Sequence, residues 1–141
     1  MNQPQYESDK DRFAEKKFAD RMSVTGARLV KLKKNYIVDF AIERNGHVIG
    51  FIEYKRRDVM SLQYPTIILA LSKWIALCDY AKHGKAFFYV EYNDCTKHIK
   101  ITPDYIDLNM IGAWLEISGR TDRGDQYDQE PCVHIPNRCL I

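Results

Sequence analysis

The feature that most constrains this chain is a pair of apolar runs that carry ionisable residues. Residues 37–42 form one run and contain Asp39, and residues 48–55 form the other and contain Glu53. Asn45-Gly46, a pair typical of a hairpin turn, lies between them and predicts two antiparallel strands. Burying an unpaired charge costs several kcal/mol. The two acids therefore need a compensating partner, and a divalent metal bound by both carboxylates would provide one.

The length of the connecting loop decides whether these side chains can meet. A two-residue turn pairs Arg44 with His47 and puts Asp39 and Glu53 on opposite faces, because strand side chains alternate. A three-residue loop, or a bulge beside a two-residue turn, puts Asp39, Glu53 and Lys55 on one face. A shared site therefore requires an odd loop or a bulge, and a clean two-residue turn with an unbulged ladder would exclude it.

Length and composition indicate a globular protein. The chain has 141 residues, of which 45% are hydrophobic and 28% charged, and its net charge is +2. We expect a single domain over residues 1–141, with a core at about 9–101 and a C-terminal extension at about 102–141. The small net charge is compatible with a nucleic-acid partner only through a local basic stripe.

Cysteine spacing and hydropathy bear on the compartment. The four cysteines lie far apart without a CxxC pair, so we expect free thiols rather than a zinc knuckle or a disulfide framework. The start of the chain is polar, and the most apolar run, 67–78, is interrupted by Lys73 and is shorter than the roughly 20 residues that span a bilayer. We expect a cytoplasmic protein without membrane association.

The pattern along the chain predicts an α/β (α+β) fold with a central mixed sheet flanked by helices. A first helix at 9–22, capped by Ser8, carries Glu15 within its apolar arc of Ala14, Phe18, Ala19 and Met22. The remaining expected elements are strands at 27–32, 37–42, 48–55, 86–92 and 97–101, a helix from Pro65 to about 82, a helix or turn carrying Met110, Ile111, Trp114 and Leu115, a mobile loop at 118–130 and a short strand at 132–135.

The ionisable residues match the requirements of phosphodiester hydrolysis. Carboxylates can hold one or two Mg²⁺ ions, which neutralise charge on the phosphorus centre, and a lysine can orient or deprotonate the attacking water. Glu53 and Lys55 share one strand face because they are two residues apart. The backbone carbonyl of Tyr54, between them, would remain available as a further metal ligand.

Val38-Asp39, thirteen intervening residues and Glu53-Tyr54-Lys55 resemble the motif of the PD-(D/E)XK nuclease superfamily, with Val38 in place of the proline. That group includes restriction endonucleases, Holliday-junction resolvases and small phage nucleases. The family core, a helix, three strands, a helix and a strand (αβββαβ), matches the expected order from 9 to 92. The resemblance implies a restriction-endonuclease-like fold.

The resemblance also implies roles for individual residues. Asp39 and Glu53 would be metal ligands together with the Tyr54 carbonyl, Lys55 would act on the water, and Glu15 would assist from the first helix. The implied activity is that of a Mg²⁺-dependent (or Mn²⁺-dependent) deoxyribonuclease, an endonuclease acting on duplex or branched DNA. A phage-encoded homodimer without a nucleotide cofactor fits this reading, since cutting both strands needs two symmetric sites.

Basic residues flank the two strands and predict a path for the phosphate backbone. They are Lys31, Lys33, Lys34, Arg56 and Arg57, and the resemblance adds Lys73, with Tyr64, on the following helix. Solvated strand ends explain the same charges equally well. The alternative function is a catalytically inactive nucleic-acid-binding module of the same fold, in which the site residues persist as a salt-bridged cluster.

Overall fold

A computed structural model describes residues 9–23, 26–118 and 129–141 of the chain. Its helices are α1 (Asp9–Met22) and α2 (Leu71–Tyr80). Its strands are β1 (Ala27–Lys31), β2 (Phe40–Arg44), β3 (His47–Arg56), β4 (Thr66–Ala70), β5 (Lys85–Glu91), β6 (Thr96–Ile101), β7 (Trp114–Ser118) and β8 (Glu130–Pro136). Short 3₁₀ turns lie at Lys34–Tyr36, Pro103–Ile106, Leu108–Ile111 and Asn137–Cys139.

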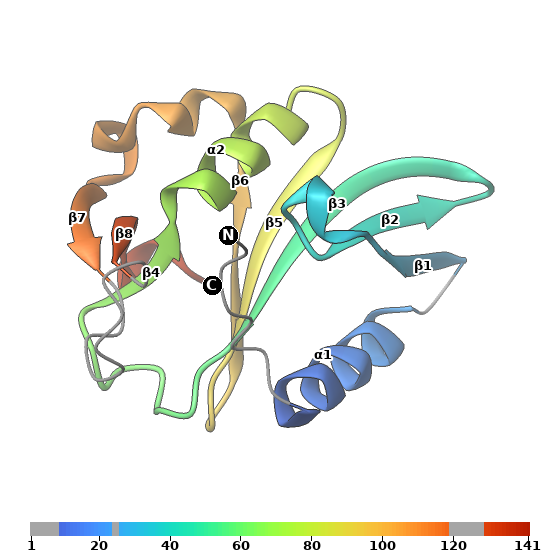
Figure 1. The fold of residues 1–141 in the computed structure, drawn as a ribbon, viewed down its shortest axis with the longest axis horizontal. Coiled ribbons are helices and arrows are strands. Elements are labelled where there is room, and N and C mark those ends of the chain that lie inside the picture. The colour runs from blue at the N-terminus through green and yellow to red at the C-terminus, as the bar shows by residue number, and fades with distance from the viewer. Residues whose placement is uncertain (1–8, 24–25, 119–128) are drawn as a thin grey trace.

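The strands form two sheets (Figure 1). The first has the order β1-β2-β3-β5-β6, in which β3 and β5 are parallel and the other neighbours antiparallel. The second has the order β4-β8-β7 and is antiparallel. A parallel pair needs a crossover, which β4 and α2 provide between β3 and β5. The predicted central mixed sheet, including the β5–β6 hairpin, is confirmed.

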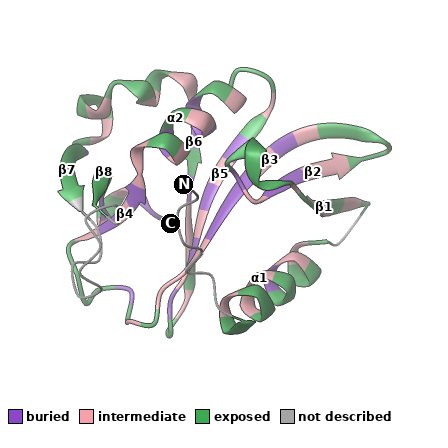
Figure 2. Cartoon of the chain, viewed as in Figure 1, coloured by how far each residue is buried: buried purple, intermediate pink, exposed green. Residues whose placement is uncertain are grey.

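Each face of the first sheet is covered by one helix. Ile52 and Tyr54 of β3 pack with Phe18 of α1. The preceding side chain, Phe51, points the other way and stacks on Tyr80 at the end of α2, with ring centroids 4.3 Å apart. The buried residues concentrate along β3 and β5, which lie between the two helical layers (Figure 2). The helices on both faces agree with the sequence prediction.

The first helix follows its sequence pattern closely. Asp9 and Asp11 lie in its first turn and Arg21 in its last, each favourable with the helix dipole. Phe18 is only 1% exposed, and the neighbours on its predicted arc, Ala14, Ala19 and Met22, pack around the same cluster. The predicted helix is confirmed, whereas its expected cap, Ser8, lies outside the described residues.

The β2–β3 connection is a two-residue turn. Arg44 pairs with His47, and Asn45 and Gly46 both have positive φ, at 52° and 79°. This conformation is the one that Asn-Gly favours in hairpins. A two-residue turn without a bulge would separate the two acids.

A bulge follows the turn at once. Glu43 pairs with Val48 but Ile42 pairs with Gly50, so Ile49 is an extra residue on β3. One extra residue shifts the alternation of the strand by one position. This is the irregularity that a shared site required.

Beyond the bulge, Phe40 pairs with Ile52, so Asp39 lies at the next position, beside Glu53. The expected strand at 37–42 began too early, because β2 starts only at Phe40. Ile37 adopts a φ of 73° after the 3₁₀ turn Lys34–Tyr36, which bends the chain before the strand. Asp39 therefore sits at the mouth of the hairpin rather than inside β2.

The expected helix from Pro65 to 82 is wrong in its first part. Residues Thr66–Ala70 form β4, which pairs with β8, and α2 begins only at Leu71. The run is rich in β-branched side chains, which favour strands. Ile67 and Leu69 alternate as buried residues, at 2% and 3% exposure. The second half of the predicted helix is confirmed, with Trp74 fully buried.

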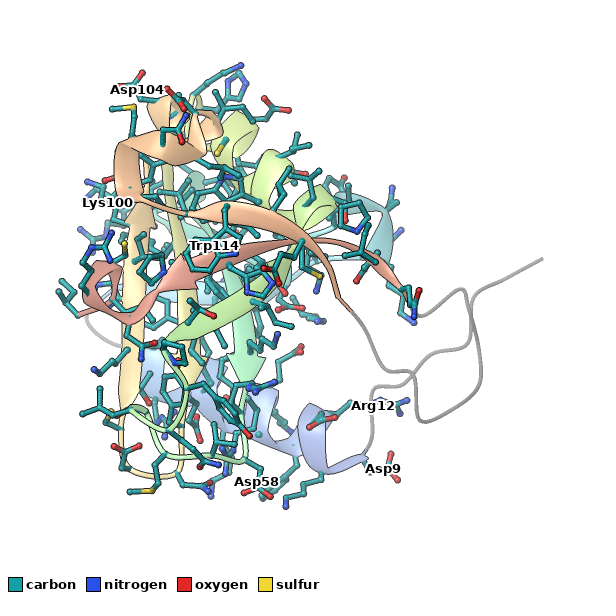
Figure 3. All side chains as sticks on the ribbon, turned by 90° about the vertical axis from the view of Figure 1, so that its left-hand side faces the viewer. Asp9, Arg12, Asp58, Lys100, Asp104 and Trp114 are labelled. Atoms are coloured by element: carbon teal, nitrogen blue, oxygen red, sulfur yellow. The ribbon has the colours of Figure 1, made fainter. Side chains whose placement is uncertain are left out.

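The C-terminal segment also differs from expectation. The predicted helix or turn around Met110 resolves into 3₁₀ turns, and Gly112 ends the second of them with a φ of 69°. Trp114 and Leu115 lie on β7 instead. Figure 3 turns the second sheet towards the viewer and labels Trp114 on it. Its indole stacks on His134 of β8 at 5.6 Å between ring centroids.

The expected final strand at 132–135 is confirmed within β8, and most of the loop expected at 118–130 lies outside the described residues. Across the described ranges, no helix combines the length and hydropathy needed to cross a membrane.

Candidate active site

A cavity of about 400 Å³ opens where β2 and β3 separate, between α1, β3 and the junction of β4 with α2. Five acids and two lysines line it: Asp11, Glu15, Asp39, Glu53, Glu130, Lys55 and Lys73. The structure therefore brings together all four residues that the sequence assigned to catalysis.

Asp39 is fixed by the backbone of the neighbouring strand. Its Oδ2 accepts a hydrogen bond of 2.8 Å from the Tyr54 N–H, and its own carbonyl accepts one of 2.8 Å from the Leu32 N–H. The amide hydrogen bond holds one carboxylate oxygen against β3. The other oxygen, Oδ1, faces Lys31 at 3.2 Å.

Glu53 is the most unusual side chain of the site, because it is a carboxylate with only 2% exposure. Its Oε2 accepts a hydrogen bond from the Lys73 ammonium at 2.6 Å. Its Oε1 is buried and has no hydrogen-bond partner among the described residues. Burial raises the pKa of Glu53 to about 8 against the opposing pull of Lys73, and the nearby Asp39 charge raises it further.

Lys55 lies on the same face of β3 as Glu53 and reaches the second sheet. Its ammonium donates a hydrogen bond of 2.7 Å to the carbonyl of Ile68 in β4. Burial lowers the pKa of Lys55 to about 8, and the positive charges of Arg57 and Lys73 lower it further. A lysine with this pKa has a substantial neutral fraction near physiological pH, and a neutral amine can accept a proton.

Glu15 reaches the site from α1. Its Oε1 lies 2.5 Å from the Lys31 ammonium, which is also 3.2 Å from Asp39. Burial lowers the pKa of Lys31, but the contacts with both carboxylates outweigh this effect and raise the pKa above its ordinary value. Asp11, one turn earlier on α1, lines the same cavity.

The chemistry of these groups fits a divalent metal. The described residues contain no ready-made cluster of three acidic, histidine or cysteine ligands. The buried Oε1 of Glu53, however, lacks a partner, and a cation would remove the cost of burying it. The Tyr54 N–H points at Asp39, and its carbonyl points to the same side of β3, since both groups of a strand residue face one neighbour. Two carboxylates and one carbonyl are hard oxygen ligands of the kind that Mg²⁺ prefers.

The predicted nucleic-acid contacts divide into three groups. Lys33 and Lys34 are exposed where the chain enters the 3₁₀ turn, and Lys34 lines a second pocket that also includes Asp39 and Lys73. The Arg56 guanidinium is committed to the end of β5, where it donates to the Glu91 carbonyl at 3.2 Å and to Asn93 Oδ1 at 2.7 Å, as well as to the Arg57 carbonyl. Lys31 and Lys73 hold carboxylates of the site itself.

Sequence reasoning missed two contributions to the cavity. Leu69 and Ala70 line it from β4, which the expected helix concealed; the β-branched run before them was the available signal. Glu130 enters from β8, and no local pattern pointed to it.

Comparisons with known proteins identify the family. The family described as "Phage putative PDDEXK endonuclease" matches residues 1–140. Hjc, a Holliday junction resolvase of the archaeal hyperthermophile Archaeoglobus fulgidus, has a similar structure. The TM-score is 0.57 over 92% of this chain and 86% of the resolvase, at 13% identity, so this likeness concerns the fold alone. No curated protein matches the chain. Because the family match spans nearly the whole sequence, the chain belongs to the phage PDDEXK endonuclease family.

Proposed function

We propose that this nuclease is a divalent-metal-dependent endonuclease that hydrolyses DNA phosphodiester bonds, with Mg²⁺ or Mn²⁺ as cofactor. The observation that carries the proposal is the buried Glu53 carboxylate, one oxygen of which has no partner in the described structure, beside Asp39 at the mouth of the hairpin. A merely structural acid would be expected to have both oxygens satisfied or exposed.

Each residue has a proposed role in this reaction. Asp39, Glu53 and the Tyr54 carbonyl would hold the ion, which when bound supplies charge neutralisation and lowers the pKa of water. Lys55, held by the Ile68 carbonyl, orients the attacking water and takes a proton at Nζ. Glu15 supports the charge balance of the site from α1.

DNA is proposed as substrate on two grounds. The family is one of phage endonucleases, and the exposed Lys34 lines a pocket that shares Asp39 and Lys73 with the active-site cavity, with the exposed Lys33 next to it in the sequence. The structurally similar protein is a Holliday junction resolvase, so branched DNA should be tested along with duplex DNA. Cleavage of paired strands would further call for a homodimer with two related sites.

Cleavage of labelled DNA tests the proposal. Duplex, four-way-junction and single-stranded substrates would be incubated with Mg²⁺, Mn²⁺ or EDTA. We expect metal-dependent cleavage by the parent and loss of at least about a hundredfold in Asp39→Asn, Glu53→Gln and Lys55→Ala, the scale on which positioned catalytic groups act. Asp79→Asn, which removes an exposed carboxylate on α2, is the matched control. Cleavage unaffected in all three site variants would refute the assignment.

Metal binding supplies a readout that does not depend on activity. Mn²⁺ should raise the melting temperature of the parent, because a ligand that binds only the folded state stabilises it. The increase should be lost in Asp39→Asn and retained in Asp79→Asn.

A second candidate function, DNA binding without catalysis, is favoured by one observation. Lys73 pairs with Glu53 and Lys31 with Asp39, which is the salt-bridged cluster that an inactive module would retain. DNA binding by the parent without cleavage under any metal, and without a Mn²⁺-dependent change in melting temperature, would select this candidate.

A further inference from the structure

One ammonium group joins two acids that come from different elements. Lys31 is the last residue of β1. Its Nζ lies 2.5 Å from Oε1 of Glu15 on α1 and 3.2 Å from Oδ1 of Asp39 at the mouth of the hairpin. The same ammonium lies 5.4 Å from the centroid of the Phe40 ring. Lys31 therefore places one positive charge against two acids that line the cavity.

The particular oxygen that Lys31 contacts is informative. Oδ2 of Asp39 accepts the Tyr54 amide hydrogen bond, whereas Oδ1 faces only the ammonium of Lys31 among the contacts described above. An ion that binds Oδ1 would share or take over this contact.

The other lysine of the site is arranged differently. Lys73 contacts Oε2 of Glu53 and leaves Oε1 without a partner in the described structure. A cation can therefore reach Glu53 while Lys73 stays in place. Of the two ion pairs, the one between Lys31 and Asp39 is therefore the one that a bound metal ion would displace.

The side chain of Lys31 is more exposed than those of the two acids that it contacts. It is 51% exposed, whereas those of Glu15 and Asp39 are 14% and 17% exposed. Exchanging one ion-pair partner for another costs a half-exposed lysine little free energy, because ion pairs at the surface contribute little to stability. The Asp39 carboxylate is held by the Tyr54 amide, so the ammonium is the group that can leave.

We propose that Lys31 is a built-in counter-cation that couples metal binding to DNA binding: without metal it holds Asp39 and Glu15, and with metal bound it is released to pair with a substrate phosphate. The inference rests on the proposed function for the identity of metal and substrate. It makes the phosphate contact of Lys31 depend on bound metal, whereas the basic stripe was expected to contact phosphates with or without metal.

Mn²⁺ binding without DNA tests the first half. Lys31→Gln removes the competing cation, so its dissociation constant for Mn²⁺, measured by electron paramagnetic resonance or calorimetry, should fall by about three- to tenfold, the range that follows from partly exposed ion pairs. Lys16→Gln, which removes an exposed lysine next to Glu15 in the sequence, controls for the change in net charge and should alter the constant by less than about twofold.

DNA affinity tests the second half, in a Lys55→Ala background that suppresses cleavage. Adding Lys31→Gln should weaken DNA binding by about three- to tenfold in Mn²⁺ but by less than about twofold in EDTA, where the ammonium is held by the acids. Adding Lys16→Gln should have the same effect under both conditions.

The outcomes separate this inference from the proposed function. If the parent binds Mn²⁺ through Asp39 but Lys31→Gln binds it no more tightly than Lys16→Gln, the inference is overturned and the proposed function stands. An equal loss of DNA affinity with and without metal also overturns it. If the parent binds no Mn²⁺, both fail.

Discussion

Replacing Glu53 by glutamine should stabilise the metal-free protein while abolishing cleavage. Glu53 is 2% exposed, and burial raises its pKa from an ordinary 4.5 to about 8. A carboxyl group with a folded-state pKa above its unfolded-state value binds more protons when folded. The free energy of unfolding therefore falls as the pH rises through the interval between the two values. Glutamine, which does not ionise, escapes this loss.

The magnitude follows from the same two values. Each pH unit inside the interval costs about 1.4 kcal/mol, so the stability gap between Glu53→Gln and the parent should widen by about 3 to 4 kcal/mol between about pH 5 and about pH 8. Urea denaturation in EDTA at both pH values measures this gap. The variant lacks the ion pair with Lys73 at both pH values, so this loss largely cancels when the two stability gaps are subtracted. Asp79→Asn shows the pH dependence expected for an exposed acid. A gap that changes by less than about 1 kcal/mol would refute the claim that burial of the carboxylate carries this cost.

Three further outcomes concern the fold that holds the site. Lys73→Met should destabilise the protein by about 1 to 3 kcal/mol, more at high than at low pH, because Glu53 loses the partner of a partly exposed pair; urea denaturation at two pH values checks this. Phe18→Ala should cost about 3 to 5 kcal/mol in the same assay, since Phe18 is 1% exposed and anchors α1. Gly50→Ala should lower the melting temperature and cost more than about 1 kcal/mol, because a Cβ there would lie 2.6 Å from the Lys85 carbonyl oxygen of the parallel strand.

The part of the site that depends on the alternation of side chains along a strand could be predicted from the sequence. Asp39, Glu53 and Lys55 were placed on one face on the condition of an odd loop or a bulge, and the bulge at Ile49 meets that condition. The position of the bulge could not be predicted from the sequence. The Asn-Gly turn favours one strand register and the burial of the apolar side chains another, and only the packing of the whole sheet determines where the register changes. The pairing of Glu53 with Lys73 was equally out of reach, since it depends on how α2 is set against β3.

The second sheet escaped prediction for a different reason. Residues 66–70 are apolar and continue into a true helix, and a short apolar run is consistent with either structure. What makes them a strand is the partner β8, which comes from the other end of the sequence. The signals for β7 were similarly weak, because Trp114 and Leu115 lie in a strand of only five residues.

The hydrogen bond from Lys55 to the Ile68 carbonyl connects the reacting end of β3 to that second sheet. Ile68 lies on β4 and is paired with His134 of β8, so the strand that holds the ammonium is itself paired with the last part of the described chain. Val133 and Ile135 of β8 are fully buried in the same core as Ile67 and Leu69 of β4, so these two strands should open only with the rest of the protein. The ammonium of Lys55 should therefore keep its place until the fold itself is lost. Activity and secondary structure should then be lost at the same temperature, and the amides of β8 should exchange with the free energy of global unfolding.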